Sequence, residues 1–285
     1  MKAWGCYRHV RRGGHAARLT LWAGALCLLP AAAGALIAAA GWLPADPTAL
    51  VGASDAAPSG AHWLGTDALG RDILSRLADA SAHFMLPGLL AVAVALLVGG
   101  LLGIAEGLAG AGAGAVSLWL LQVLDAVPKF VFVLLVAAIA RSELAWIMAT
   151  VGLTFAPQIA GAIRQSVDRL KATAFIEAER SLGASLGRIV FVHILWGHAR
   201  RLILAQVSSL AAYALLVESS LSYLGGELGV QEPHASWGNM IALARDGVFR
   251  GHLLPALLPA ALVSVTLLGF TLLGQGLLTA LEERV

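Results

Sequence analysis

Six stretches of this chain are apolar over about 20 residues or more, and they restrict it to folds that a lipid bilayer surrounds. The hydrocarbon core of a bilayer is about 30 Å thick, and a helix of about 20 apolar residues crosses it. The chain is 59% hydrophobic and 13% charged, whereas a soluble domain carries about 25% charged residues. We therefore expect an all-α integral membrane protein with six transmembrane helices, at 19–43, 85–108, 116–140, 144–163, 202–224 and 253–281.

The first apolar run, 19–43, follows a basic tail and is rich in alanine, a pattern that a cleaved signal peptide would also show. The apolar region of a signal peptide is about 7–15 residues long, and this run is longer. An uncleaved first helix is therefore favoured. Residues 1–18 then form an N-terminal tail, and residues 44–84 connect the first two spans.

Basic residues gather in two segments that six spans would place on the same side of the membrane. One is the tail 1–18, and the other is the segment 164–201 between the fourth and fifth spans. Loops rich in Lys and Arg stay in the cytoplasm, so both termini are expected to be cytoplasmic. The segment 44–84 then lies on the opposite side of the membrane, and aspartates outnumber arginines in it.

Three glycines recur every four residues in the second span, at Gly99, Gly103 and Gly107. Residues at this spacing lie on one face of a helix, and small side chains let another backbone approach closely. The pattern predicts that this face packs against another span.

The cytoplasmic segment 164–201 carries apolar residues at roughly helical intervals among charged ones, which an amphipathic helix pair covering its own bundle would also show. Residues 177–185, followed by His193-Ile194-Leu195, resemble the EAA loop of ABC-importer permeases, which forms a coupling helix in a groove of the ATPase subunit. Glu179 stands where that family has a second alanine, and Trp196 where it has a proline. The resemblance implies these ATPase-docking residues: Glu177, Ala178, Glu179, Gly183, Ala184 and Ser185.

Three further segments look like signatures of the dipeptide/oligopeptide/nickel subfamily of these permeases. They are 65–77, spelled GTDALGRDILSRL, 221–225, spelled LSYLG, and 236–240, spelled SWGNM. The likeness covers roughly residue 62 to the C-terminus. The chain departs from the subfamily by a small insertion at 226–228 and by Asp125, which lies closer to Pro128 than the usual aspartate does.

The resemblance implies the type I importer permease fold, with a core domain at 85–285, in a bacterial cytoplasmic (inner) membrane. It also implies several partners: a second permease subunit, two ATPase subunits and an extracytoplasmic solute-binding protein. The chain has no GxxxxGK[ST] phosphate loop, so ATP and Mg would bind the partner ATPases, and neither a cofactor nor a catalytic residue is expected here. Short peptides are the expected cargo, and nickel or a metal chelate is the nearest alternative.

Two other classes of protein compete with this interpretation. A self-contained secondary transporter would show internal repeats and paired broken helices, and the sequence shows neither. A membrane scaffold that transports nothing has no need of polar residues inside its spans, and this chain has several.

The candidate site residues fall into two groups. The external motifs imply a gate or a surface for the binding protein, although Asp72 and Arg76, four residues apart, could simply form a surface ion pair. Inside the spans, Asp125, Lys129 and Glu218 are candidates for the translocation pathway, because ionised side chains in a membrane usually face water or the bundle interior. Asp125 and Lys129 could instead neutralise each other across Pro128, where a kink is expected. The external candidates are Gly65, Thr66, Asp67, Gly70, Arg71, Asp72, Trp237, Gly238 and Asn239; the scattered histidines predict no metal site.

Overall fold

The computed structural model describes residues 2–108, 111–140, 143–171, 197, 199–225 and 228–282. Within these residues the chain is helical apart from connecting loops and one isolated β-bridge between Thr66 and Asp72. The all-α class expected from the sequence is confirmed. The helices are α1 (Lys2–Ala39), α2 (Ile73–Leu108), α3 (Ala111–Ala126), α4 (Lys129–Ala140), α5 (Leu144–Lys171), α8 (Arg200–Leu224), α9 (Trp237–Phe249) and α10 (Leu254–Glu282).

Five of these helices are long and apolar enough to cross a membrane by themselves, namely α1, α2, α5, α8 and α10. Their large apolar side chains face outward over much of the surface; Trp22 of α1 is 76% exposed and Leu97 of α2 is 65% exposed. Contiguous exposure on this scale is typical of side chains that lipid covers. Helix α2 begins at Ile73, so the second span continues into the segment expected to precede it.

The third expected span is divided into two helices. Helix α3 ends at Ala126, α4 begins at Lys129, and the two are bent by 82° relative to each other. Pro128 explains the break, because proline has no backbone N–H to continue the hydrogen-bond ladder and restricts the residue before it. Counted together, the bent pair is the sixth candidate span.

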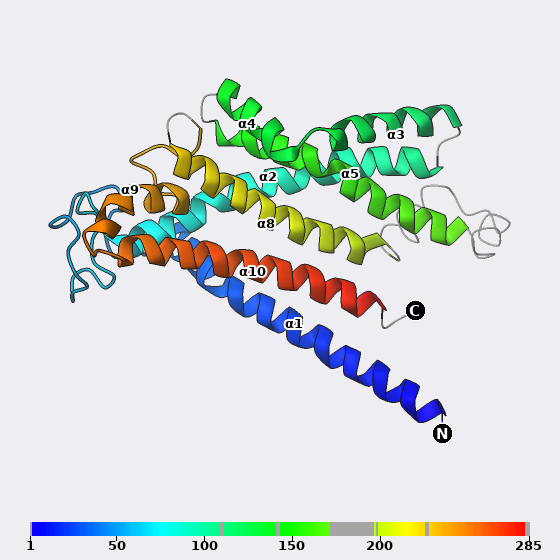
Figure 1. The fold of residues 1–285 in the computed structure, drawn as a ribbon, viewed down its shortest axis with the longest axis horizontal. Helices are drawn as coiled ribbons and strands as arrows, with labels where there is room; N and C mark the ends of the chain where they lie inside the picture. Colours follow the sequence, from blue (N-terminus) through cyan, green and yellow to red (C-terminus); the bar gives the residue numbers. More distant parts are fainter. Residues whose placement is uncertain are drawn as a thin grey trace.

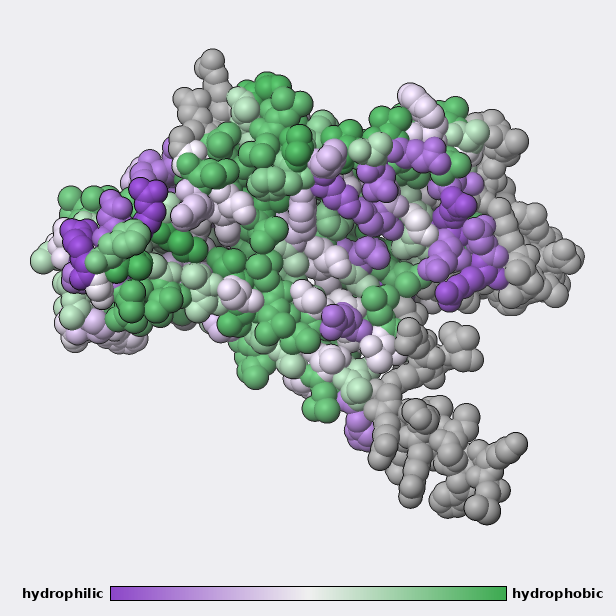
Figure 2. Space-filling model, in the orientation of Figure 1, coloured by the Kyte–Doolittle hydropathy of each residue, from purple (hydrophilic) through white to green (hydrophobic). Residues whose placement is uncertain are grey.

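The helices form an elongated bundle with different segments at its two ends (Figure 1). The loops of residues 44–72 and helix α9 gather at one end, called here the loop end. The start of α1, the end of α5, the start of α8 and the end of α10 lie at the opposite end. Figure 2 shows hydrophilic residues at the loop end and in a patch over α5, with mostly hydrophobic surface between them.

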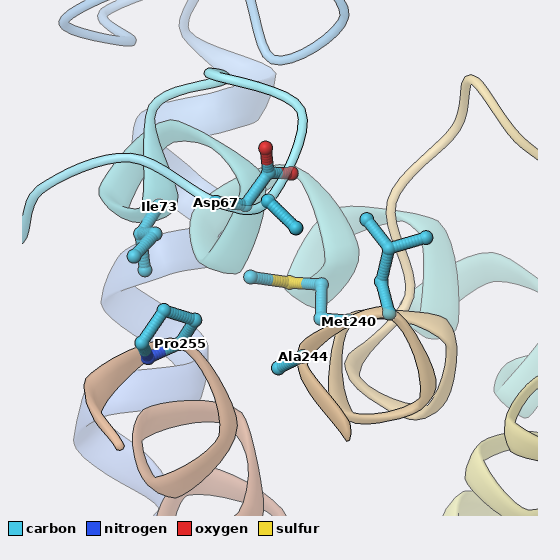
Figure 3. Close-up of a pocket in the computed structure, with 7 residues that line it drawn as sticks. Asp67, Ile73, Met240, Ala244 and Pro255 are labelled. Carbon is cyan, nitrogen blue, oxygen red and sulfur yellow. The ribbon is translucent and has the colours of Figure 1, made fainter. Parts of the chain in front are cut away.

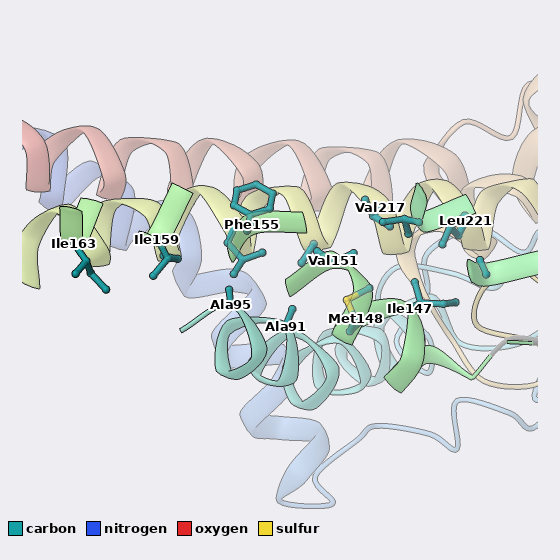
Figure 4. Close-up of a cluster of buried hydrophobic side chains, with 14 of the residues drawn as sticks. Ala91, Ala95, Ile147, Met148, Val151, Phe155, Ile159, Ile163, Val217 and Leu221 are labelled. Carbon is teal, nitrogen blue, oxygen red and sulfur yellow. The ribbon is translucent and has the colours of Figure 1, made fainter. Parts of the chain in front are cut away.

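Helices α2 and α5 pack closely along their length, and small residues make this possible. A Cβ atom added to Gly103 would lie 2.8 Å from the Cα atom of Ala160, and one on Gly99 would lie 2.5 Å from the backbone oxygen of Ala156. The glycine face predicted from the sequence is therefore confirmed at these two positions. Beside it, buried apolar side chains of α2, α5 and α8 form the main core (Figure 4).

We predict that Gly103→Ala destabilises the bundle, because the new methyl group collides with the α5 backbone. Overpacking of this kind costs about 1–3 kcal/mol. The matched control is Gly100→Ala on the same helix, where an added Cβ meets nothing within 4 Å. Thermal unfolding of the purified protein in detergent measures the difference, and equal melting temperatures for the two variants would contradict the packing described here.

Candidate functional site

The external motif at 65–72 folds into a tight turn at the loop end. The Asp67 carboxylate accepts hydrogen bonds from the backbone N–H groups of Leu69 (2.9 Å) and Arg71 (3.0 Å). Gly65 and Gly70 both have φ of +80°, a conformation that side chains disfavour. A Cβ on either glycine would also collide with the backbone oxygen of residue 56 or 52. Backbone geometry therefore requires both glycines of the motif.

The charged residues of this motif form a buried cluster with a residue far along the chain. Arg71 donates from Nε to Asp67 (2.8 Å) and from Nη1 to Glu232, which lies in the connection between α8 and α9. Arg76 donates from Nη2 to Glu232 at 3.2 Å, and its Nε lies 3.5 Å from the Asp67 carboxylate. We call Asp67, Arg71, Arg76 and Glu232 the charge cluster. Its two positive and two negative charges balance.

Burial distinguishes the members of the charge cluster. The side chains of Arg71 and Arg76 are 3% and 0% exposed and that of Asp67 is 9% exposed, whereas Glu232 is 38% exposed. Burial by itself would lower the pKa of Arg71, but the hydrogen bonds and charges of Glu232 and Asp67 outweigh this effect and raise that pKa above its usual value. Both arginines also need hydrogen-bond acceptors, and Nη1 of Arg76 donates to the backbone oxygens of Pro47 and Pro233 (both 3.2 Å).

Asp72 caps the start of α2 and does not pair with Arg76. Its Oδ2 atom accepts from the backbone N–H and the hydroxyl of Ser75, both at 2.8 Å, as an N-cap side chain does. Its Oδ1 atom lies 3.0 Å from Nδ1 of His62. The surface ion pair considered from the i,i+4 spacing of Asp72 and Arg76 is therefore not what the structure contains.

The second external motif, 236–240, starts helix α9 and joins it to α2. Ser236 and Asn239 form a reciprocal capping box, in which each side chain accepts a hydrogen bond from the backbone N–H of the other. The indole N–H of Trp237 donates to the backbone oxygen of Leu77 in α2 (3.2 Å). Gly238 packs so closely on α8 that a Cβ would collide with the backbone oxygen of Ser219.

The two external motifs, distant in sequence, are therefore packed into one unit. Figure 3 shows Asp67 and Ile73 of the first motif, Met240 and Ala244 of α9, and Pro255 of α10 around one small space; the Asp67 carboxylate points away from α9. The cavity between them holds about 10 Å³, roughly the space of one water molecule. The loop end is a packed interior rather than an open binding cleft at this point.

Glu218 lies apart from the other candidates for the pathway. It is 4% exposed in α8, where it accepts hydrogen bonds from the hydroxyls of Ser222 (2.9 Å) and Ser219 (3.3 Å). The Ser222 hydroxyl also accepts from the backbone N–H of Val230 (3.0 Å). In this arrangement Glu218 anchors the connection between α8 and α9.

The remaining candidates are distributed as follows. Asp125 is exposed at the end of α3, Lys129 is partly buried at the start of α4, and no ion pair joins them in the described structure. The bend between the helices breaks the i,i+4 relation on which mutual neutralisation depends. The expected docking residues Glu177, Ala178, Glu179, Gly183, Ala184 and Ser185 lie outside the described residues.

Glu232 is the residue of this site that sequence reasoning missed. It lies in the loop between the 221–225 and 236–240 motifs and belongs to neither of them. The available signal was charge balance: two neighbouring arginines require two carboxylates if they are buried, and Asp72 is not one of them because it caps α2.

The fold and this site define a multi-pass membrane protein in which the loops at one end are packed firmly onto the helical bundle. Residues 99–285 match the family of binding-protein-dependent transport system inner membrane components, and the chain belongs to this family. It is therefore a permease component of ABC importers and resides in the inner membrane.

Several characterised or named permeases are similar to this chain over most of its length. The glutathione transport system permease protein GsiD of Pectobacterium atrosepticum is 35% identical over 80% of this chain and 74% of its own length. The oligopeptide transport system permease protein OppC of Bacillus subtilis is 33% identical over 81% and 75%. The probable D,D-dipeptide transport system permease protein DdpC of Escherichia coli is 32% identical over 80% and 75%.

We predict that Glu232→Ala destabilises the loop end, because it leaves two buried guanidinium groups with one carboxylate. Removing one partner of a fully buried ion pair costs about 3–5 kcal/mol, and the partial exposure of Glu232 reduces the expected loss to about 2 kcal/mol. Asp246→Ala is the control, since the Asp246 side chain is 80% exposed on α9. Thermal unfolding in detergent compares them; if both variants melt like the wild type, the charge cluster does not stabilise the loop end.

Proposed function

We propose that this chain is one of two permease subunits of an ABC importer for short peptides. The observation that carries the proposal is its similarity to permeases named for glutathione, a D,D-dipeptide and oligopeptides. All three cargoes are small peptides or peptide-like molecules, which favours peptides over nickel or a metal chelate.

The remaining subunits follow from the family. A second permease completes the translocation pathway, two ATPase subunits bind ATP and Mg and drive the cycle, and a solute-binding protein delivers the cargo. This chain itself binds no cofactor and carries no catalytic residue. The basic tail and the basic segment 164–201 support a cytoplasmic location for both termini and the ATPases, and the loop end then faces the binding protein.

The geometry suits this division of labour. Most of the motif side chains at the loop end are buried in hydrogen bonds and ion pairs within the subunit, so they hold the external segments rigidly in place. A rigid loop end gives the binding protein a constant surface and lets the subunit move as one body when the ATPases close. Of the charge cluster, Glu232 is the member with substantial exposure to a partner on that side.

We predict that deletion of this gene abolishes uptake of a labelled dipeptide that the intact strain accumulates, and that a plasmid copy restores it. The physical reason is that the complex has no complete translocation pathway through the bilayer when one permease subunit is missing. Normal dipeptide accumulation in the deletion strain would contradict the peptide assignment. So would a deletion strain that loses nickel uptake and regains it, but not dipeptide uptake, with the plasmid copy.

We predict that Gly183→Arg releases the ATPases from the complex, because a long cationic side chain prevents close approach of a coupling helix to its groove. Affinity purification in mild detergent, followed by mass spectrometry, measures this loss. Gly183→Ala is the control and is expected to retain the ATPases. The second permease is expected to be recovered with both variants. Recovery of ATPases with Gly183→Arg would place the docking contact elsewhere.

A further inference from the structure

The break between α3 and α4 places a lysine against the middle of helix α5. Lys129 is the first residue of α4, and its ammonium lies 4.7 Å from the centre of the Phe155 ring of α5. Phe155 and Gln158 lie near the midpoint of α5 (Leu144–Lys171), roughly 20 Å from either end of that helix. The positive charge therefore lies beside the interior of a candidate membrane span, Leu144–Arg169, more than two helical turns from either of its ends.

The groups around this ammonium compensate its charge only in part. The face of the Phe155 ring attracts a cation. With its carboxamide oxygen turned toward the lysine, Gln158 accepts a hydrogen bond from Lys129 and donates one to the Phe155 backbone oxygen at 3.1 Å. Both are neutral groups. No carboxylate of the described residues lies within ion-pair distance of Lys129, and Asp125 is exposed on the far side of the 82° bend.

A charge in this position is costly unless an opposite charge reaches it. Lysines inside membrane spans pair with carboxylates or face water, and they mark substrate and ion pathways. Lys129 is only partly buried, so a carboxylate from outside the subunit can approach it. Broken helices near the membrane midplane hold substrate sites in other classes of transporter, and the break at Pro128 is of this kind.

A second polar group at the same depth lacks a partner. Tyr213 lies near the middle of α8, and its ring centre is 5.3 Å from that of Phe155. Its hydroxyl is buried and makes no hydrogen bond within the described residues. A buried hydroxyl without a partner is unfavourable. Phe155 therefore lies between two side chains that could each bind a polar group: the cation of Lys129 and the unused hydroxyl of Tyr213.

We propose that Lys129 binds the carboxylate of the cargo at the midpoint of the translocation pathway, with Gln158 and Tyr213 contributing polar contacts. The ligand class is a carboxylate, and in a short peptide the C-terminal carboxylate is the group that every cargo shares. This inference rests on the proposed function. The competing source of the same chemistry is a carboxylate of the second permease subunit, which would pair with Lys129 permanently.

The test is uptake by the complete importer, reconstituted in proteoliposomes with its binding protein and ATPases. The cargoes are a labelled dipeptide and the same dipeptide with a C-terminal amide. The ratio of acid uptake to amide uptake is measured for each variant and compared with the wild-type ratio. The same binding protein serves every variant, so its own preference for the acid or the amide cancels in this comparison. Lys129→Gln is expected to lower this ratio about tenfold or more, and Lys129→Arg is expected to restore most of it.

Two further variants make the comparison specific. Tyr213→Phe removes only the unpaired hydroxyl, so it is expected to leave the fold intact and to reduce acid uptake by less than Lys129→Gln does. Arg245→Gln removes a cation that is 71% exposed on α9, and it is expected to leave the acid-to-amide ratio unchanged.

Three results would overturn the inference. An unchanged ratio in Lys129→Gln, or an equal fall for both cargoes, shows that Lys129 does not recognise a carboxylate on the cargo. Loss of the second permease from the purified Lys129→Gln complex shows that the carboxylate belongs to that subunit. If the wild-type importer transports neither cargo, the proposed function itself is wrong and the inference falls with it. If the wild type transports the dipeptide and Lys129→Gln has the same acid-to-amide ratio, only the inference about Lys129 is wrong.

Discussion

The guanidinium groups of Arg71 and Arg76 are buried, and the arrangement of the loop end depends on neutralising them. Removing two such charges from water is costly unless carboxylates and hydrogen-bond acceptors surround them. Asp67 comes from the external turn, Glu232 from the connection between α8 and α9, and the arginines flank the start of α2. Pairing these side chains requires the three segments to meet. Helix α9 is then held by its own capping box and by the hydrogen bond from Trp237 to α2, so one electrostatic requirement organises a region assembled from distant parts of the chain.

Within the membrane a different constraint applies. Lipid offers no hydrogen-bond partner, so backbone groups must be satisfied inside helices or by neighbouring elements. Helices α2 and α5 each continue past an internal proline, Pro87 and Pro157, and they pack through glycine and alanine. The bent pair α3–α4 departs from this condition at Pro128, and the interruption brings Lys129 onto the middle of α5. The loop end is thus rigid and internally neutralised, whereas the centre of the bundle retains a charge that its own described neighbours do not fully balance.

Much of this could be predicted from the residues, and the failures have physical causes. The apolar runs predicted the spans because the bilayer sets a minimum helix length, and the spacing of Gly99 and Gly103 predicted a packing face because helical periodicity is local. The ion pair between Asp72 and Arg76, one of two alternatives that the sequence left open, does not form because a carboxylate at a helix N-cap turns toward the N–H groups of its own first turn. A kink at Pro128 was expected, but mutual neutralisation of Asp125 and Lys129 needs the two side chains to stay neighbours, and a bend of 82° separates them. Glu218 was a candidate for the translocation pathway; its serine partners lie in its own helix, but the loop that Ser222 holds through Val230 is a contact between elements.

The sequence by itself determined the class of the protein, the number and approximate position of its spans, the motifs that identify its family and the glycines that its turns require. These depend on hydrophobic length, local periodicity and backbone conformation, all of which act over a few residues to a few tens of residues. Only the tertiary structure decided that Glu232 completes the charge cluster, 161 positions from Arg71, and that Lys129 lies against Phe155 and Gln158 in the middle of α5. Charge pairing and burial depend on distance in space, and the spatial distance between remote residues is set by how the helices pack.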